Sequence, residues 1–125
     1  MARSLPARAR TQEPSEKAIQ TSVIGHWRVL GVAGSLVAAV PNAGALGQPG
    51  LRRGLFDLVV LSPTLGAATG WLELKRESRR GEKLGGLSDD QIEFRAVCLS
   101  RGVPHAVAYG RDEPIEVLRK WGAVR

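Results

Sequence analysis

The chain has 125 residues, enough for one domain with a modest core, and its 43% hydrophobic and 24% charged residues exclude disorder of the whole chain. Its net charge of +6 points to a polyanionic partner, most simply a nucleic acid, although a basic balance can also serve solubility alone. The single cysteine excludes an internal disulfide and fits a reducing, cytoplasmic compartment. With only two histidines beside it, a zinc cluster is excluded as well, so the ligands of any bound metal would be mostly oxygens, which favours Mg²⁺ or Mn²⁺.

The N-terminal segment 1–14 carries Arg3, Arg8 and Arg10 before its first acid and lacks the apolar core of a secretory signal. An organellar transit peptide would look similar, but we favour a flexible basic arm, followed by a single domain over residues 15–125. Residues 29–51 carry no charge, yet glycine and proline interrupt this run too often for a membrane helix. No association with a membrane is therefore expected.

The first predicted element is a helix between Ser15, a good N-cap, and Gly31. Its apolar side chains recur at helical spacing, at Ile19, Val23, Trp27 and Leu30. A short strand over 35–40 then stops at Pro41-Asn42-Ala43-Gly44, a sequence typical of a turn.

A glycine-rich loop runs from this turn to Arg53. Strands are predicted over 56–61 and 71–76, and we expect them to pair antiparallel because they are adjacent in sequence. A polar, mostly basic loop over 76–86 follows the second of these strands. It is either a solvated loop or a flap that contacts phosphate.

Another helix is predicted from Ser88 to Gly102, then a strand over 103–109, and a last helix from Asp112. One stripe of the helix after Ser88 contains Gln91, Phe94 and Cys98, and an adjoining apolar stripe contains Ile92, Ala96 and Leu99. The order α-β-β-β-α-β-α predicts an α/β fold with a central sheet flanked by helices.

The strand over 71–76 has two different faces, because side chains alternate along a strand. Leu72 and Leu74 point to one face, and Trp71, Glu73 and Lys75 point to the other. An acid and a lysine so placed commonly form a solvated ion pair of little energetic value. Asp57 changes the interpretation, because it heads the neighbouring strand, where its carboxylate can converge with that of Glu73.

Two neighbouring carboxylates repel each other unless a cation lies between them, and Mg²⁺ accepts one or two carboxylates while it keeps several waters. Asp57 and Glu73 are the candidate ligands, and the backbone carbonyl of Leu74 could complete the set. Such a metal polarises a phosphodiester and activates water. Lys75 would orient that water or stabilise the developing oxyanion. The pattern therefore suggests metal-assisted hydrolysis of a phosphodiester.

The residues Asp57 and Glu73-Leu74-Lys75 resemble the signature of the PD-(D/E)XK nucleases. Further segments resemble one branch of that superfamily, the VRR-NUC domain in its stand-alone phage and bacterial form. These segments are Glu16 in the first helix, Pro41-Asn42-Ala43-Gly44, Gly54 and Ser88-Asp89-Asp90-Gln91. The resemblance covers roughly residues 15–111 and implies a restriction-endonuclease-like core with a central mixed sheet.

The resemblance also implies roles for individual residues. Asp57 and Glu73 would be metal ligands, and Lys75 would be the catalytic lysine. Glu16 would hold metal-bound water, although an acid in the first turn of a helix can simply complement the helix dipole. Gln91 would orient the lysine or a phosphate. One departure is Phe56, which stands where the family has proline before its first acid; we expect the site to survive this change.

The activity implied is a Mg²⁺-dependent endonuclease, with Mn²⁺ as a substitute, that cuts branched DNA such as four-way (Holliday) junctions, as a homodimer. The predicted phosphate contacts are Arg53, Arg76, Arg79, Arg80 and Lys83. The alternative is a basic DNA-binding protein without catalysis, in which Glu73 and Lys75 merely pair. A nuclease that acts on single strands or RNA is a third possibility.

Overall fold

The computed structural model describes residues 13–41 and 49–125 of the chain. The predicted basic arm therefore lies mostly outside the described residues, as does most of the Pro41-Asn42-Ala43-Gly44 turn. Among the residues that are described, no helix is both long enough and apolar enough to cross a membrane.

The observed elements follow the predicted order, with two short 3₁₀ helices where a loop was expected. The α-helices are α2 (Glu16–Leu30), α4 (Asp89–Arg101) and α5 (Asp112–Lys120); the strands are β1 (Leu36–Ala39), β2 (Leu58–Leu61), β3 (Gly70–Lys75) and β4 (His105–Tyr109); and the 3₁₀ helices are η1 (Glu77–Gly81) and η2 (Lys83–Gly86). The prediction of a plain loop over 76–86 was therefore wrong.

The four strands form one mixed sheet in the order β1-β2-β3-β4. Strands β1, β2 and β3 pair antiparallel, as predicted for the second pair, whereas β4 lies parallel to β3. Strand β2 begins at Leu58, two residues later than predicted, so Asp57 lies immediately before it. Glu73 lies in the middle of β3, opposite Val107 of β4.

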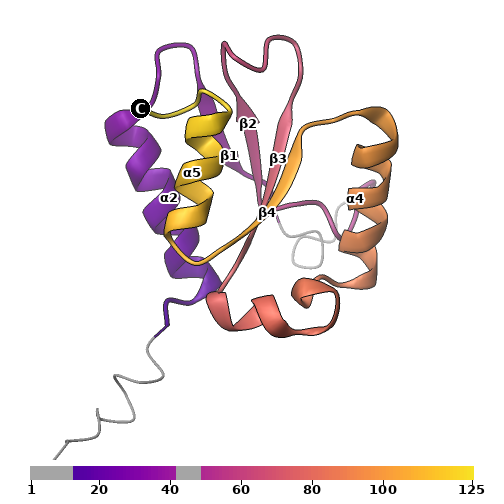
Figure 1. Cartoon of the computed structure of the whole chain (residues 1–125). Helices are drawn as coiled ribbons and strands as arrows, with labels where there is room; N and C mark the ends of the chain where they lie inside the picture. Colours follow the sequence, from indigo (N-terminus) through magenta and orange to yellow (C-terminus); the bar gives the residue numbers. More distant parts are fainter. Residues whose placement is uncertain (1–12, 42–48) are drawn as a thin grey trace, which may run out of the picture.

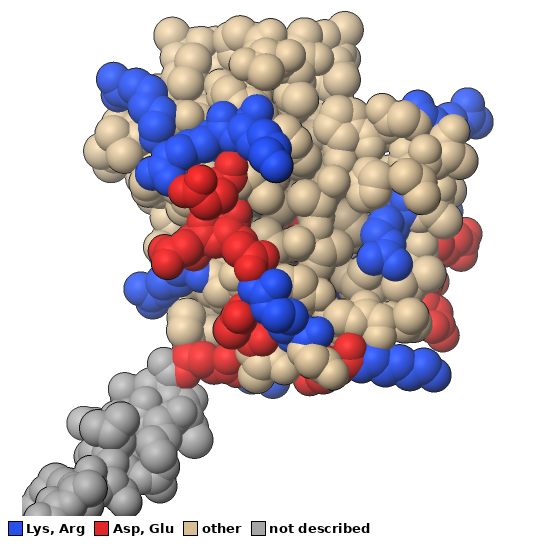
Figure 2. All heavy atoms as spheres, in the orientation of Figure 1, with Lys and Arg blue, Asp and Glu red and all other residues tan. Residues whose placement is uncertain are grey.

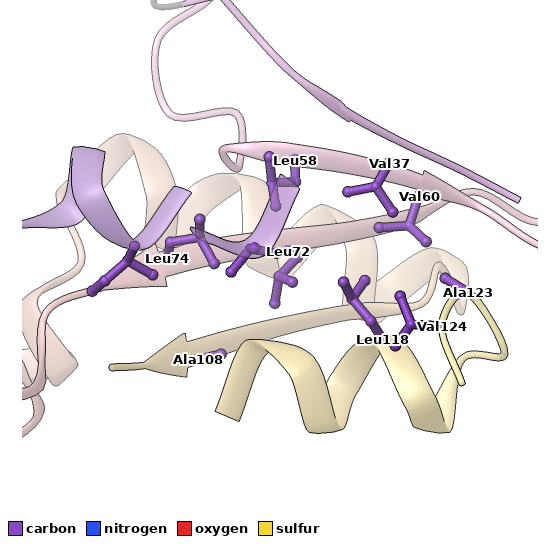
Figure 3. Packing of buried hydrophobic residues seen from close by; sticks show 11 residues of the cluster. Val37, Leu58, Val60, Leu72, Leu74, Ala108, Leu118, Ala123 and Val124 are labelled. Carbon is purple, nitrogen blue, oxygen red and sulfur yellow. The ribbon is translucent and has the colours of Figure 1, made fainter. Parts of the chain in front are cut away.

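The sheet separates two layers of helices: α2 and α5 cover one face, and α4 covers the other (Figure 1). The main core fills the space between the sheet and the pair α2 and α5 (Figure 3). Its members are Ile19, Val23, Val37, Leu58, Val60, Leu72, Leu74, Ala108, Leu118, Ala123 and Val124. Leu72 and Leu74 therefore point into this core, which leaves Glu73 and Lys75 on the α4 side, as the alternation predicts.

Helix α4 is positioned by its ends and by a narrow apolar stripe. Ser88 caps its first turn, and Gly102 ends it in the left-handed conformation at φ 68°. Cys98 is buried, but Leu99 is 72% exposed, so the expected second apolar stripe of this helix is wrong. Since α4 is the helix that covers this face of the described sheet, with none packed beside it, its Leu99 side meets solvent and only its narrow Cys98 stripe is buried.

Candidate active site

Asp57 and Glu73 are brought together by two hydrogen bonds that cross between their chain segments. The backbone N–H of Asp57 donates to Oε1 of Glu73 at 3.1 Å, and Oδ2 of Asp57 accepts the N–H of Leu74 at 2.8 Å. Each carboxylate is thus held by the backbone beside the other. Glu73 is 2% exposed, which excludes the solvated surface pair considered above.

Lys75 and Gln91 close the site on the side of α4. The Nζ atom of Lys75 lies 3.4 Å from Oε2 of Glu73 and donates to Oε1 of Gln91 at 3.2 Å. The Nε2 atom of Gln91 donates to Oε2 of Glu73 at 2.8 Å. Like Glu73, Lys75 is almost fully buried. Gln91 therefore bridges the lysine and the acid.

The orientation of the Gln91 amide follows from the capping box at the start of α4. The N–H of Ser88 donates to Oε1 of Gln91 at 3.0 Å, while Oγ of Ser88 accepts the N–H of Gln91 at 3.2 Å. Because a backbone N–H needs an acceptor, Oε1 points to Ser88 and Lys75, and the amide nitrogen is left to face Glu73. Ser88 is recognisable in the sequence as a cap, but this consequence for Gln91 was not predicted.

The two carboxylates titrate above their ordinary range. Burial raises the pKa of Glu73 to about 8, and the charge of Asp57 adds to this effect, while Lys75 opposes it. Burial also raises the pKa of Asp57, against the hydrogen bond from Leu74. Since burial disfavours ionisation of both acids, and the charge of Asp57 further disfavours that of Glu73, a cation between them would stabilise the site.

Glu16 lies beside this pair without joining it. Its Oε2 atom accepts the N–H of Arg76 at 3.4 Å and lies 3.5 Å from Nη1 of Arg79, and its side chain is 37% exposed. Within residues 13–41 and 49–125, no three His, Cys, Asp or Glu side chains group closely enough to hold a metal. Its negative charge nevertheless contributes to the raised pKa of Asp57.

The donor set of Asp57 and Glu73 fits a small hard cation. Both side chains offer oxygen, and Mg²⁺ needs only one or two carboxylates because it keeps several waters. Oδ2 of Asp57 accepts the Leu74 N–H, and Asp57 is half-buried rather than enclosed. The composition, with one cysteine and two histidines, favours oxygen ligands over the nitrogen and sulfur ligands that zinc prefers.

The predicted phosphate contacts fall into two groups. Arg79 is engaged by Glu82 at 2.6 Å and by the carbonyl of Gly86 at 2.8 Å. Arg80 pairs with Glu77 and Glu113. Arg76 lies 3.7 Å from Glu13, whereas Arg53 and Lys83 are exposed. The first two guanidinium groups therefore bind the η1–η2 segment to its surroundings in the structure.

Charge on the visible face is mixed rather than segregated. Figure 2 shows blue and red side chains interleaved along the left side and the lower edge, and an upper end without charged side chains. The lower edge coincides with η1 and η2 in Figure 1. The net positive charge is thus not collected into one continuous basic surface on this face.

Three aromatic residues beside the polar cluster were not assigned to the site from the sequence. Phe94 makes edge contacts with Phe56, at 5.1 Å between ring centroids, and with Trp71, at 5.3 Å. The signal was present in the spacing, because each aromatic residue lies one to three positions from a polar site residue. Trp71 and Trp121 are both half-buried.

No family model and no curated protein matches the sequence of the chain. Among solved structures, a VRR_NUC domain matches with a TM-score of 0.57 and 18% sequence identity, over 83% of this chain and 94% of that one. The chain therefore has the fold of a VRR_NUC domain, a restriction-endonuclease-like fold with a mixed four-stranded sheet. The predicted fold class is confirmed.

Proposed function

We propose that the chain is a metal-dependent endonuclease that hydrolyses phosphodiester bonds in DNA. The observation that carries the proposal is the pair Asp57 and Glu73, each hydrogen-bonded by the backbone of the other segment and each with a raised pKa. Glu73 is buried and Asp57 beside it is half-buried, so their ionisation is disfavoured, and a bound cation would offset that cost. The VRR_NUC-like fold supports the same conclusion.

Asp57 and Glu73 would hold Mg²⁺, with Mn²⁺ as a substitute, together with the carbonyl of Leu74. When bound, the metal supplies Lewis acidity toward a phosphodiester and lowers the pKa of its water. Glu16 is too far from the pair to complete a three-acid cluster, so we assign it a role through water. The protein's own contribution is to hold the two carboxylates in place before the cation arrives.

Lys75 would act on the reacting phosphate. Its ammonium group is fixed by Glu73 at 3.4 Å and Gln91 at 3.2 Å, so it forms a positioned point charge at the edge of the acid pair. A fixed charge requires no reorganisation when negative charge develops on a phosphate oxygen. Lys75 also has a proton with which to orient an attacking water. Gln91 positions Lys75 and Glu73 relative to each other.

The family resemblance extends the proposal to substrate and assembly. We infer a preference for branched DNA, including four-way junctions, and a homodimer. Arg53 and Lys83 are the first candidates for phosphate contact because both are exposed and neither forms an ion pair within the described part of the chain, unlike the three other arginines. Arg76, Arg79 and Arg80 would have to exchange their intramolecular partners for phosphate. The rival without catalysis, a basic DNA-binding protein, gives no reason to place Asp57 beside the buried Glu73.

The test is cleavage of a labelled four-way junction and a matched linear duplex, in Mg²⁺ or Mn²⁺ and in EDTA. Wild type is compared with Asp57→Ala and Lys75→Ala. We expect metal-dependent cutting of the junction that both substitutions abolish. Equal cutting of both substrates would keep the nuclease and remove the junction preference. Tight DNA binding without cutting in either metal would establish the non-catalytic rival instead.

A further inference from the structure

The aromatic residues Phe56, Trp71 and Phe94 form a cluster, which we call the aromatic triad. Phe94 is its centre, with interplanar angles of 67° to Phe56 and 77° to Trp71. Edge-to-face contacts at this separation are favourable beyond the area that they bury. Phe56 is fully buried. These contacts join α4 to β3 and to the segment that precedes β2.

Each member of the aromatic triad is tied along the chain to one member of the polar site. Phe56 directly precedes Asp57. Trp71 lies two residues before Glu73, on the same face of β3, and Phe94 lies three residues after Gln91, on the same face of α4. The three chain segments that carry the polar cluster are therefore the same three that meet in the aromatic triad.

The segment before Asp57 also lies along α4 over several residues. Arg52 pairs with Glu93 at 2.8 Å. Gly54 has φ +88°, and a Cβ atom there would lie 2.5 Å from the backbone carbonyl oxygen of Asp90. Together with the contact between Phe56 and Phe94, this close packing fixes the segment that leads to Asp57 against α4.

We propose that the aromatic triad is a positioning unit, in which packing of Phe94 against Phe56 and Trp71 sets the placement of Asp57 and Glu73 relative to Gln91. The packing itself does not depend on the proposed function, but its effect on metal binding rests on that function. Proline at position 56, as in the related pattern, would restrict the backbone before Asp57 directly. Phenylalanine imposes no such restriction, so contact with α4 performs that task in this chain.

The first test needs no metal. Amide hydrogen exchange, followed by NMR, reports the two hydrogen bonds of the site, from the N–H of Asp57 and the N–H of Leu74. Phe94→Leu, which removes the central ring but keeps an apolar side chain, should speed exchange at Asp57 and leave the rest of the sheet protected. Leu118→Ala, a core change on the opposite face of the sheet, should not affect Asp57 selectively.

The second test is Mn²⁺ binding by titration calorimetry on the folded variants. We expect Phe94→Leu to weaken binding by about 10- to 100-fold, the range typical of residues that support metal ligands. Trp71→Phe, which keeps a ring edge, should lose less affinity than Trp71→Leu. Leu118→Ala should bind as wild type does, even if it melts at a lower temperature.

The outcomes separate the inference from the proposed function. Unchanged exchange at Asp57 in Phe94→Leu, or equal weakening in Leu118→Ala, overturns the positioning role, whatever the enzyme does. Failure of wild type to bind Mn²⁺ overturns the proposed function, and the exchange measurement then decides the positioning role alone. Wild-type exchange and affinity in Phe56→Leu, which removes the ring without restricting the backbone, would show that the contact with Phe94 does not place Asp57, and would also overturn the positioning role.

Discussion

Replacing Asp57 by asparagine should stabilise the metal-free protein at alkaline pH, although it removes a proposed metal ligand. Asparagine keeps an oxygen for the N–H of Leu74, which lies 2.8 Å from Oδ2 of Asp57. The change removes the negative charge that, after burial, contributes most to the raised pKa of Glu73. The native repulsion between the two acids would therefore disappear while the shape of the site is kept.

The pH dependence has a definite sign. Glu73 has a pKa of about 8 in the folded protein against an ordinary value of 4.5. Below pH 4.5 both folded and unfolded chains hold the proton; between 4.5 and 8 only the folded protein holds it, so the free energy of unfolding falls as pH rises. Above pH 8, the raised pKa of Glu73 corresponds to a loss of roughly 5 kcal/mol in the free energy of unfolding. Because Glu73 stays buried in the variant, we expect Asp57→Asn to recover only about 1–2 kcal/mol of this loss.

The assay is urea unfolding followed by circular dichroism, in EDTA, at pH 5 and pH 8.5. The variant should gain stability over wild type mainly at the higher pH. Addition of Mn²⁺ should stabilise wild type and leave the variant unchanged, because only wild type keeps both acids. A variant that is less stable than wild type at pH 8.5 in EDTA, or a difference that does not vary with pH, would refute the reasoning.

Three further substitutions test separate parts of the site. Lys75→Met should retain Mn²⁺ binding by calorimetry but lower the cleavage rate by about 10²–10³-fold, the loss typical of one charge-stabilising group; unchanged cleavage would contradict its role. Ser88→Ala should cost about 1 kcal/mol of unfolding free energy in urea, because it removes the hydroxyl that accepts the N–H of Gln91, but should leave kcat near wild type, because the backbone N–H that holds the Gln91 amide remains; a large loss of kcat would contradict this assignment. Gly54→Ala should destabilise by about 1–3 kcal/mol, since its Cβ would meet the carbonyl of Asp90 at a positive φ; a neutral result would show that the loop moves freely.

Local signals in the sequence predicted most of the helices and the sheet. Ser15 and Ser88 cap α2 and α4 as expected, because a capping hydroxyl acts within its own turn. Alternation along β3 placed Glu73 and Lys75 opposite the core side chains correctly. These properties depend on neighbours in the chain, so they can be read without knowledge of the fold.

Long-range contacts explain what the sequence did not predict. The 76–86 segment forms 3₁₀ turns partly because Glu13, far away in sequence, accepts the N–H of Ser78 at 2.9 Å. Tyr109 donates to the carbonyl of Gly85 at 2.6 Å in the same segment. Neither partner can be inferred from composition, and the ion pair of Arg80 with Glu113 is equally non-local, whereas its pair with Glu77 spans only three residues.

The site itself was predicted in part. The convergence of Asp57 and Glu73 followed from adjacent strands and alternating side chains, and the structure brings the two residues within hydrogen-bonding distance. The burial of Phe56 against α4 could not be predicted, because it depends on how the helix crosses the sheet. That same packing starts β2 at Leu58 and leaves Phe56 outside the ladder.

The most direct measurement is titration calorimetry of the metal-free protein with Mn²⁺ at pH 8, on wild type and Asp57→Asn. The account predicts a Mn²⁺ site in wild type that is lost in the variant. The binding enthalpy of wild type should also depend on the ionisation heat of the buffer, because Glu73, with a pKa of about 8, must release its proton when the metal binds. Equal binding by both proteins, or no binding by wild type, would contradict a cation site at Asp57 and Glu73.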